Sequence, residues 1–378
     1  MKKSSQRQES ASALGAERIN LQDGGTLVSQ PAPTDPRLRG VQALERFAGI
    51  ERIAGLLLAL GLICLFFTLS SPYFLTQTNI FNILLQSSSL MIVAVGLTIV
   101  LITAEIDLSI GAVEALTGSV AAVLIINQGV PVIPGVALAL GAAVLVGLIN
   151  GFLTTKLGVV SFITTLAMLG IAQGVAFLLT NGQAVAGFPD AYGYIGRAKI
   201  DGFPVPAIIA GVVVIGAYLM LTKTKIGLYF YAVGANREAA ALAGLNPARI
   251  RTLALVLGAL LAGVGGLILS SRLDAGNGLF GENDLLAAVA AVVIGGASLF
   301  GGVGTVIGTA IGVLIIGTIG NGLVLLNVEE FWQQIVVGGF IIAAVVIDQL
   351  TQRGAEHARH GKRRKLLRRT SQEGHDNG

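Results

Sequence analysis

The sequence predicts an all-α, polytopic helical membrane protein, and three features of its composition lead to that class. Apolar residues make up 53% of the 378 residues and charged residues only 12%, against about 25% in soluble domains. Glycine occurs 51 times, about twice its usual share, without the Gly-X-Y repeat of collagen. Small residues allow membrane helices to pack closely. The single cysteine, Cys64, excludes a framework of disulfides within the chain.

Long apolar segments fill the middle of the chain, residues 51–350, which is the predicted transmembrane domain. Residues 1–50 are polar, lack the apolar run of a signal peptide and are expected to form a disordered tail, and residues 351–378 form a basic tail. A span needs about 20 apolar residues. The stretch 80–126 holds either two spans or one broken span. Ten spans are expected, at 53–70, 80–103, 106–126, 132–155, 159–180, 204–222, 252–271, 285–300, 303–325 and 332–350.

Basic residues form three clusters that a ten-span topology brings to one side of the membrane. Lysine and arginine number eight in residues 1–52, five in 223–251 and eight in 351–378, together 21 of the 25. If both termini are cytoplasmic, all three clusters and Lys156 face the cytoplasm, as the positive-inside rule requires. Topology is therefore preferred to nucleic-acid binding as the explanation of the net charge of +4, since the basic and aromatic pattern of a nucleic-acid surface is absent.

Three carboxylates, Glu105, Asp107 and Glu114, lie within ten residues of an apolar region. Ionised side chains inside a membrane are costly, and they tend to mark a pathway or a water-filled cavity. A helix that is interrupted here would expose its amino end, with Asp107 or Ser109 as the N-cap. Two structural alternatives remain: Glu105 and Asp107 cap a helix in a cytoplasmic turn, and Glu114 pairs with a partner in the bundle.

The basic loop 223–251 contains a short helix with signals at both ends. Asn236 is a favourable N-cap, and Glu238 lies in the first turn, where its charge suits the helix dipole. Gly244 fits the left-handed position that ends a helix. The loop is therefore predicted to display a two-turn helix, Arg237 to Ala243, in the cytoplasm. It serves either as a plain linker or as a smooth surface that fits a groove in another protein.

Three motifs, at 105–111, 238–240 and 294–304, resemble the permease subunits of bacterial ABC importers for monosaccharides in their order and spacing. The Glu-Ala-Ala triplet at 238–240, with Gly244 after it, is similar to the EAA-type loop of that family. The segments 105–111 (EIDLSIG) and 294–304 (IGGASLFGGVG) resemble its ribose, xylose and arabinose branch. The resemblance runs from about residue 47 to 353, nearly the whole membrane portion.

This resemblance implies a transport subunit with no catalytic residue, no metal and no cofactor of its own. ATP and Mg²⁺ would lie on a separate ABC ATPase subunit, and a periplasmic sugar-binding protein and a second copy of the chain would complete the assembly in the inner membrane. The implied ATPase-coupling residues are Asn236, Glu238, Ala239, Ala240 and Gly244. The implied substrate path comprises Glu105, Asp107, Ser109, Glu114, Asn82 and Gln86, with Ser88, Asn150 and Asn321 as further candidates; the alternative for each amide or hydroxyl is a hydrogen bond between helices.

Within the branch, three segments resemble the xylose permeases most, at 102–109, 267–273 and 327–334. The pairing of Glu105 with Asp107 is the main reason, since relatives more often carry glycine at the first position. Xylose is therefore the expected substrate. The region 181–205 is shorter than in some xylose permeases, which bears on the substrate and not on the family.

Charged residues in the outer loops are expected to dock the binding protein, although isolated charges on an exposed loop are more often simply solvated. These are Arg272, Asp274, Glu282 and Asp284 after the seventh span, with Glu329 and Glu330 before the tenth.

An ion-coupled secondary transporter that uses the intramembrane carboxylates is the alternative function. It gives no reason for the 237–243 helix. The chain has no phosphate-binding loop of the G-x-x-x-x-G-K-[ST] type, and its three histidines all lie in the carboxy tail. A histidine-based hydrolase in the membrane and a Cys/His metal site are therefore excluded.

Overall fold

The computed structural model describes residues 36–329, 331–332, 334–336, 338–339 and 342. The chain divides into two units, Met1–Ile50 and Glu51–Gly378, and the second unit is described below. Helix α1 (Pro36–Ser70) begins before that division, so the expectation of a disordered tail is wrong for residues 36–50, which are helical. Glu330, most of the tenth predicted span and the basic tail lie outside the described residues.

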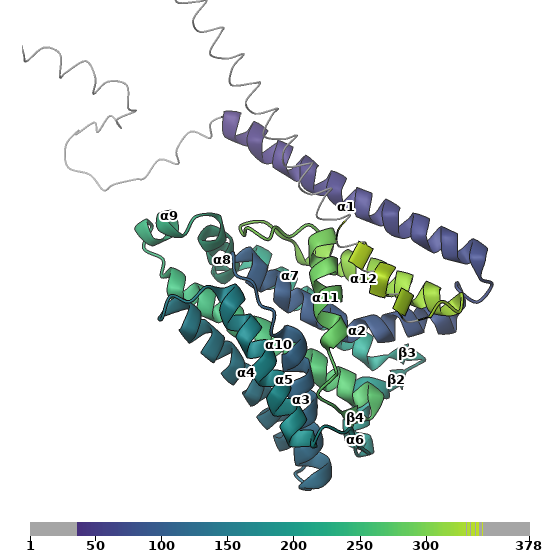
Figure 1. Cartoon of the computed structure of the whole chain (residues 1–378). Coiled ribbons are helices and arrows are strands. Elements are labelled where there is room, and N and C mark those ends of the chain that lie inside the picture. The colour runs from purple at the N-terminus through teal and green to yellow at the C-terminus, as the bar shows by residue number, and fades with distance from the viewer. Residues whose placement is uncertain (1–35, 330, 333, 337, 340–341, 343–378) are drawn as a thin grey trace, which may run out of the picture. The chain divides into compact units, whose positions relative to one another are not determined.

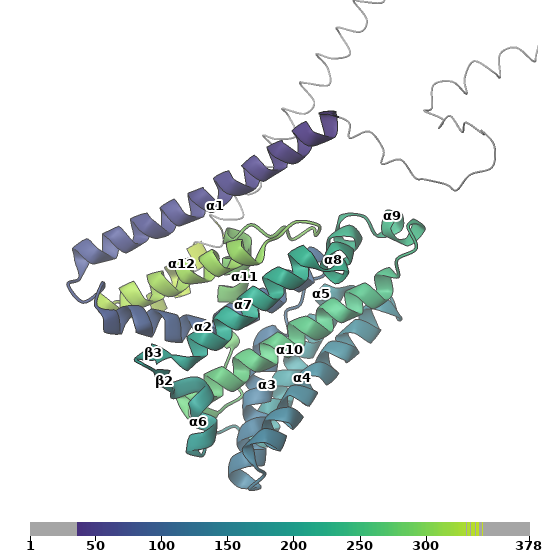
Figure 2. The ribbon, with the colours of Figure 1, turned by 180° about the vertical axis from the view of Figure 1, so that it is seen from behind.

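In the part of the second unit that the structure describes, helices predominate and the strands are four segments of two residues each, which confirms the all-α class (Figures 1 and 2). Strand β1 (Val185–Ala186) pairs antiparallel with β4 (Ala275–Gly276), and β2 (Lys199–Ile200) pairs with β3 (Phe203–Pro204). After α1 the helices are α2 (Gln77–Ile102), α3 (Ile110–Ala122) with the π-helical turn η1 (Val123–Asn127), α4 (Val132–Thr155), α5 (Ser161–Thr180), α6 (Asp190–Arg197), α7 (Val205–Lys223), α8 (Lys225–Ala235), α9 (Arg237–Leu242), α10 (Pro247–Leu273), α11 (Glu282–Ile294) and α12 (Val306–Leu325).

Eight helices of the described residues are long and apolar enough to cross a membrane. They coincide with eight of the predicted spans. The expected span 285–300 is different, because α11 has only 13 residues and ends at Ile294. The chain then continues through a glycine-rich segment, 295–305, to α12. The expected span 106–126 also begins late, at Ile110, because an extended segment precedes it.

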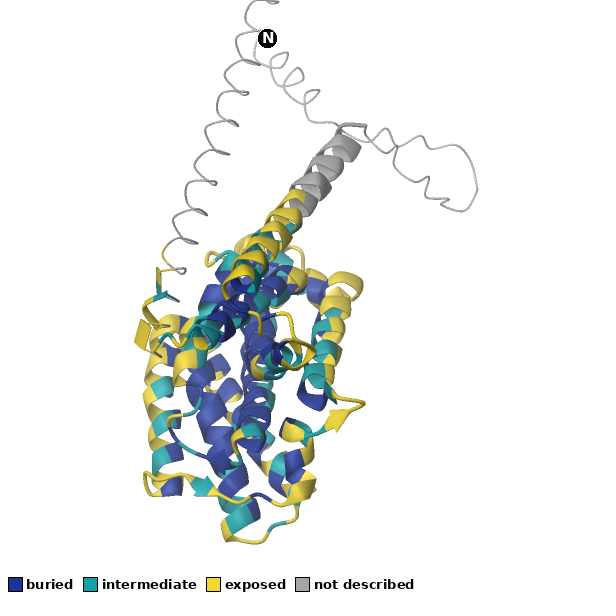
Figure 3. Cartoon of the chain, turned by 90° about the vertical axis from the view of Figure 1, so that its right-hand side faces the viewer, coloured by how far each residue is buried: buried dark blue, intermediate teal, exposed yellow. Residues whose placement is uncertain are grey.

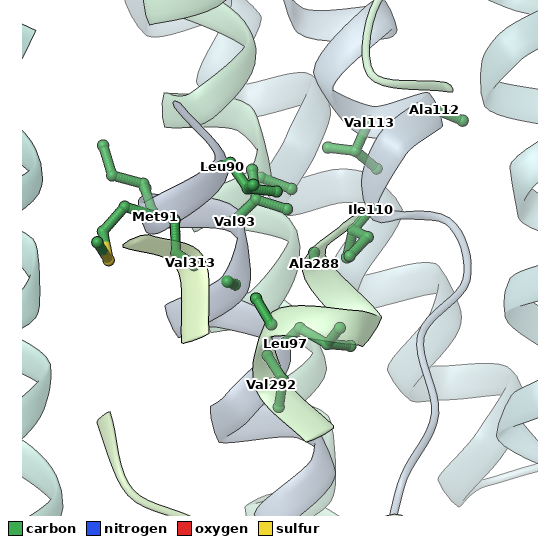
Figure 4. Packing of buried hydrophobic residues seen from close by; sticks show 14 of the residues in the cluster. Leu90, Met91, Val93, Leu97, Ile110, Ala112, Val113, Ala288, Val292 and Val313 are labelled. Atoms are coloured by element: carbon green, nitrogen blue, oxygen red, sulfur yellow. The ribbon is translucent and has the colours of Figure 1, made fainter. Parts of the chain in front are cut away.

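Helices α2 and α10 occupy the centre of the bundle. Helix α10 packs against α2, α3 and α4, and α2 also contacts α7, α11 and α12. Figure 3 shows the buried residues concentrated in the interior of the helical bundle. The main apolar cluster joins four elements through Leu97, Ile110, Val292 and Val313 (Figure 4). The central helices therefore hold together the segments in which the candidate site lies.

Glycines permit the closest crossings between helices of the chain. A Cβ atom on Gly147 of α4 would lie 2.7 Å from the Cα of Val256 on α10. A Cβ atom on Gly312 of α12 would lie 2.1 Å from the carbonyl oxygen of Ala291 on α11. No side chain larger than hydrogen fits at either crossing.

The two breaks in the membrane helices meet at one point. The first is residues 103–109, between α2 and α3, and the second is the glycine-rich segment 295–305. The N–H of Gly302 donates a hydrogen bond of 2.9 Å to the carbonyl oxygen of Ile102. Helix α8 approaches the same carbonyl so closely that a Cβ on Gly234 would lie 1.7 Å from it. Gly234 is therefore required for α8 to seat against the breaks.

Replacing Gly234 by alanine should destabilise the protein, because backbone atoms must move to make room for the methyl group. Overpacking of this kind costs about 1–3 kcal/mol, or prevents folding. Thermal unfolding of the detergent-solubilised protein measures the loss. The matched control is Gly216→Ala on α7, where no atom lies within 4 Å of the new Cβ. Equal melting temperatures for the two variants would contradict the close approach of α8.

Candidate functional site

The interruption between α2 and α3 is organised around Asp107. Its Oδ1 accepts hydrogen bonds from the N–H of Ser109 at 2.8 Å and from the Ser109 hydroxyl at 2.6 Å. Ser109 occupies the N-cap position of α3, but its hydroxyl makes no capping hydrogen bond. The predicted interruption is confirmed, and the predicted cap is not, since Asp107 closes a local turn onto Ser109 instead of capping α3.

Hydroxyl groups of α5 satisfy the backbone of the extended segment. Ser161 Oγ accepts from the N–H of Ile106 at 3.2 Å, and Thr165 Oγ1 accepts from the N–H of Leu108 at 3.1 Å. Thr165 also donates to the carbonyl of Ile106 at 3.1 Å. Backbone groups at membrane depth need such partners, because no lipid atom replaces them. The hydroxyls of α5 therefore allow a non-helical segment to exist inside the bundle.

Some buried oxygens around the break have no hydrogen-bond partner. Asn150 of α4 donates from Nδ2 to Ser109 Oγ at 3.1 Å, but its own Oδ1 accepts no hydrogen bond. Asp107 Oδ2 is likewise unpaired, and Asp107 and Asn150 are both fully buried. Thr154 and Thr164, on the two helices that flank the break, also have unpaired buried hydroxyls. The break thus combines a fixed backbone with spare acceptor atoms.

Glu105 joins the break to the basic loop. Its Oε1 accepts from Arg237 Nη2 at 2.5 Å and from Arg251 Nε, and its side chain is only 2% exposed. Arg237 Nη2 also donates to the carbonyl of Ala104 at 2.9 Å. Arg237 is the first residue of α9 and Arg251 lies near the start of α10, so one carboxylate holds three segments. The sequence placed Glu105 on the substrate path, whereas the structure gives it two arginine partners.

Helix α9 has the predicted start and stop. Asn236 Oδ1 accepts from the N–H of Ala239 at 2.9 Å, and Gly244 adopts a φ of +85°. Ala240 is buried, whereas Glu238 and Ala239 are exposed. At the end of the helix the Leu242 side chain is 91% exposed.

Helix α8 holds α9 against the bundle and was not anticipated from the sequence. Phe230 and Val233 are fully buried, and Phe230 packs beside residues of α2 and α7. The Tyr231 hydroxyl donates to the carbonyl of Gly304 at 2.7 Å, which ties α8 to the second break. Burial raises the pKa of Tyr231, so the phenol stays protonated and keeps this hydrogen bond at neutral pH.

Glu114 lies inside the bundle, away from Glu105. Its Oε1 accepts from the Ser89 hydroxyl at 2.9 Å, which confirms the expectation of a partner in the bundle, and its Oε2 has none. Arg272 on α10 and Asp284 on α11 are close enough to Glu114 to interact with its carboxylate electrostatically. Both are half-buried, and Arg272 Nη1 is buried without a hydrogen bond.

The outer charges are therefore not the isolated, loop-exposed set that the sequence suggested. Arg272 belongs to the last turn of α10, and Asp284 to the first turn of α11. Asp274 forms a 2.7 Å ion pair with Arg197 and also accepts from the N–H of Phe188 at 3.1 Å. Glu282 is exposed, as expected. The sequence missed Arg197 because it lies 77 positions away in the chain, on α6.

The remaining path candidates are scattered. Asn321 exchanges two hydrogen bonds with Asn79, at 2.8 and 2.9 Å, and thus connects α12 to α2. Ser88 donates to the carbonyl of Leu84 at 2.6 Å within its own helix. Asn82 is half-buried and Gln86 is exposed. Of this group, only Asn150 contacts the break.

The chain belongs to the family described as the permease component of the branched-chain amino acid transport system, whose model matches residues 79–345. The ribose import permease protein RbsC of Escherichia coli K12 is 43% identical over 302 residues, which cover 79% of this chain and 93% of that protein. RbsC of Bacillus subtilis is 38% identical over a region that covers 83% of this chain and 98% of that protein. The D-allose transport system permease protein AlsC of E. coli K12 is 36% identical over a region that covers 76% of this chain and 89% of that protein. No solved structure matches the chain. The chain is thus a multi-pass membrane permease component.

Glu105→Gln should lower the free energy of unfolding by about 3 kcal/mol, because a buried ion pair loses its anion while its cations remain. The matched control is Glu238→Gln on exposed α9, which should change stability by no more than about 0.5 kcal/mol. Denaturation in detergent measures both. Arg251→Met should cost more than Arg237→Met, since the Arg251 side chain is 16% exposed and that of Arg237 43%. Equal effects of the two glutamate variants would refute the structural role of Glu105.

Proposed function

We propose that this chain is the permease subunit of an ATP-driven ABC importer that carries a monosaccharide across the bacterial inner membrane, with both termini in the cytoplasm. The relatives named above are ribose and allose permeases, and a fourth relative, from Azospirillum brasilense, is an L-arabinose ABC transporter permease, 36% identical over 85% of this chain. The observation that carries the proposal is α9, a capped helix with an exposed apolar end that is held to the membrane break by Glu105.

Helix α9 is proposed to dock into the ATPase subunit, which would hold ATP and Mg²⁺. Leu242 supplies the apolar anchor, and Glu238, Ala239 and the capping residues Asn236 and Gly244 shape the surface around it. Ala240 is buried and lies on the side of α9 that packs against the rest of the protein. Movement of α9 would reach the membrane through Arg237 and Glu105. Arg251 would carry the same movement to α10.

The break at 103–109 is proposed to form part of the sugar route. A sugar presents hydroxyl groups, which donate to unpaired oxygens such as Asp107 Oδ2 and Asn150 Oδ1. Hydrogen bonds to a carboxylate are about twice as strong as neutral ones. Glu105 is assigned to coupling instead of the route, since both of its cationic partners belong to the α9 side of the molecule.

The substrate is proposed to be an aldose, with ribose as the first candidate. The relatives named above transport ribose, allose and arabinose according to their names, and none of these is a xylose permease. Xylose, expected from the three short segments, remains a candidate for the uptake test. A periplasmic sugar-binding protein would dock at the opposite end from α9, where Glu282 is exposed and the Arg197–Asp274 pair lies at the surface. A second copy of the chain would complete the pathway.

Co-reconstitution tests the function. Proteoliposomes that contain the chain, its ATPase and its binding protein should take up radiolabelled ribose with ATP inside, and unlabelled arabinose, allose and xylose in competition should rank the substrates. Omission of the ATPase is the control. Uptake by the chain alone, driven by a proton or Na⁺ gradient, would refute the proposal in favour of a secondary transporter.

Leu242→Asp should weaken ATPase docking by about 10- to 100-fold, the range expected when the burial of one leucine is lost. The permease should still insert into the membrane. Leu157→Asp, at an exposed leucine that follows α4, is the control, since it lies outside α9. Co-purification of the ATPase measures the effect. Docking that survives Leu242→Asp unchanged would count against α9 as the coupling helix.

Asp107→Asn should lower uptake while ATPase docking and thermal stability remain. The amide keeps an Oδ1 that accepts from Ser109, but it replaces the charged acceptor at Oδ2. Asp107→Ala should also lose stability, because the turn onto Ser109 is lost. Normal uptake by Asp107→Asn would confine Asp107 to the turn and remove it from the sugar route.

A further inference from the structure

A groove on the outer face of the bundle lies between α4 and α10, the two helices that run side by side in Figure 2. Its volume is about 630 Å³, within the ~300–1,000 Å³ range of small-molecule sites. The walls are apolar: Leu148, Phe152, Leu253 and Val256 supply most of the surface. The two threonines in the groove bind each other, with 3.0 Å between the hydroxyls of Thr155 and Thr252. The groove floor therefore offers methyl groups and few free polar atoms.

Two cations, Lys156 and Arg249, lie at the end of this groove nearest α9. Lys156 is the C-cap residue of α4, and Arg249 lies in the first turn of α10; both are exposed. Within the described residues, neither side chain has an ion-pair partner. Asn246 caps α10 by accepting from the N–H of Arg249 at 3.1 Å, so the positive end of a 27-residue helix points toward the same place.

The groove continues the lipid-facing surface of α4. Leu148 is 48% exposed and Phe152 55% exposed, and Leu138 and Leu145 extend the same exposed apolar surface along the helix. A molecule that fits here needs an apolar part between the helices and an anion at the membrane boundary. Anionic phospholipids have both, and basic pockets between membrane helices bind such headgroups.

A second copy of the chain fits this groove poorly. A two-fold contact places the same patch on both sides of the interface, so the unpaired cations of one copy would approach those of the other. No acidic side chain lines the groove to offset them. A lipid phosphate instead meets the guanidinium and the ammonium with opposite charge.

We propose that the α4–α10 groove is a binding site for one anionic phospholipid, whose phosphate is held by Lys156 and Arg249 and whose acyl chains lie along Leu148, Phe152, Leu253 and Val256. This goes beyond transport of the sugar and does not depend on it. The headgroup lies at the same end of the molecule as α9, so the site would fasten the beginning of α10, which also carries Arg251, to the membrane surface.

The test uses the full chain in nanodiscs of phosphatidylglycerol and phosphatidylcholine, followed by transfer to detergent and native mass spectrometry of the retained lipid. Wild-type protein should retain phosphatidylglycerol preferentially. In Lys156→Gln/Arg249→Gln the preference should fall about thirty-fold, since each cation near an anionic lipid contributes about a five-fold factor. The matched control is Lys223→Gln/Lys225→Gln, which removes two exposed cations near the junction of α7 and α8, outside the groove.

Three results would overturn the proposal: no phosphatidylglycerol preference in the wild type, an equal loss in both double variants, or a preference that persists in Lys156→Gln/Arg249→Gln. Size-exclusion chromatography of each variant provides the second measurement. A change in oligomeric state without a change in retained lipid would assign the groove to a second copy of the chain. Unchanged size-exclusion profiles, with lipid lost only in Lys156→Gln/Arg249→Gln, would support the lipid site.

Discussion

The arrangement of the candidate site depends on one buried carboxylate, Glu105. It lies where a membrane helix stops, and its two arginines come from α9 and α10. A carboxylate in this position without cations would be too costly to keep ionised, and the arginines would lose the anion that fixes their place. The contact therefore decides the position of α9 against the membrane. The contacts of α8 with Ile102 and Gly304 reinforce the same junction.

The break next to Glu105 is stabilised by hydrogen bonds to several of its backbone groups. Hydroxyls of α5 accept hydrogen bonds from the N–H groups of Ile106 and Leu108. In the second break, the N–H of Gly302 donates a hydrogen bond to the carbonyl oxygen of Ile102. Each break thus stabilises the other, and neither would be tolerated as an isolated segment in lipid.

The sequence was sufficient for features that depend on local patterns. Apolar runs located eight spans, and Asn236 with Gly244 located both ends of α9, because capping is decided within a few residues. It was insufficient where distant segments meet. Arg237 and Arg251 were counted only as part of a basic loop, although a carboxylate in an apolar segment calls for a cationic partner and these were available. The short α11 was missed because hydropathy does not distinguish a helix from the extended, glycine-rich segment after it.

The three carboxylates that first drew attention differ in how completely they are paired, and this separates their roles. Glu105 has two cationic partners, both on Oε1, which tie it to α9 and α10 and fit the coupling role proposed for it. Asp107 uses one oxygen to fix a turn and leaves the other free, which fits the sugar contact proposed for it. Glu114 pairs with Ser89 through one oxygen, interacts electrostatically with the half-buried Arg272, and belongs to the packing of α3 against α10. The proposed transport cycle would need a firm link at α9 and spare acceptors on the sugar route, and Glu105 and Asp107, the two candidates for these roles, lie two residues apart.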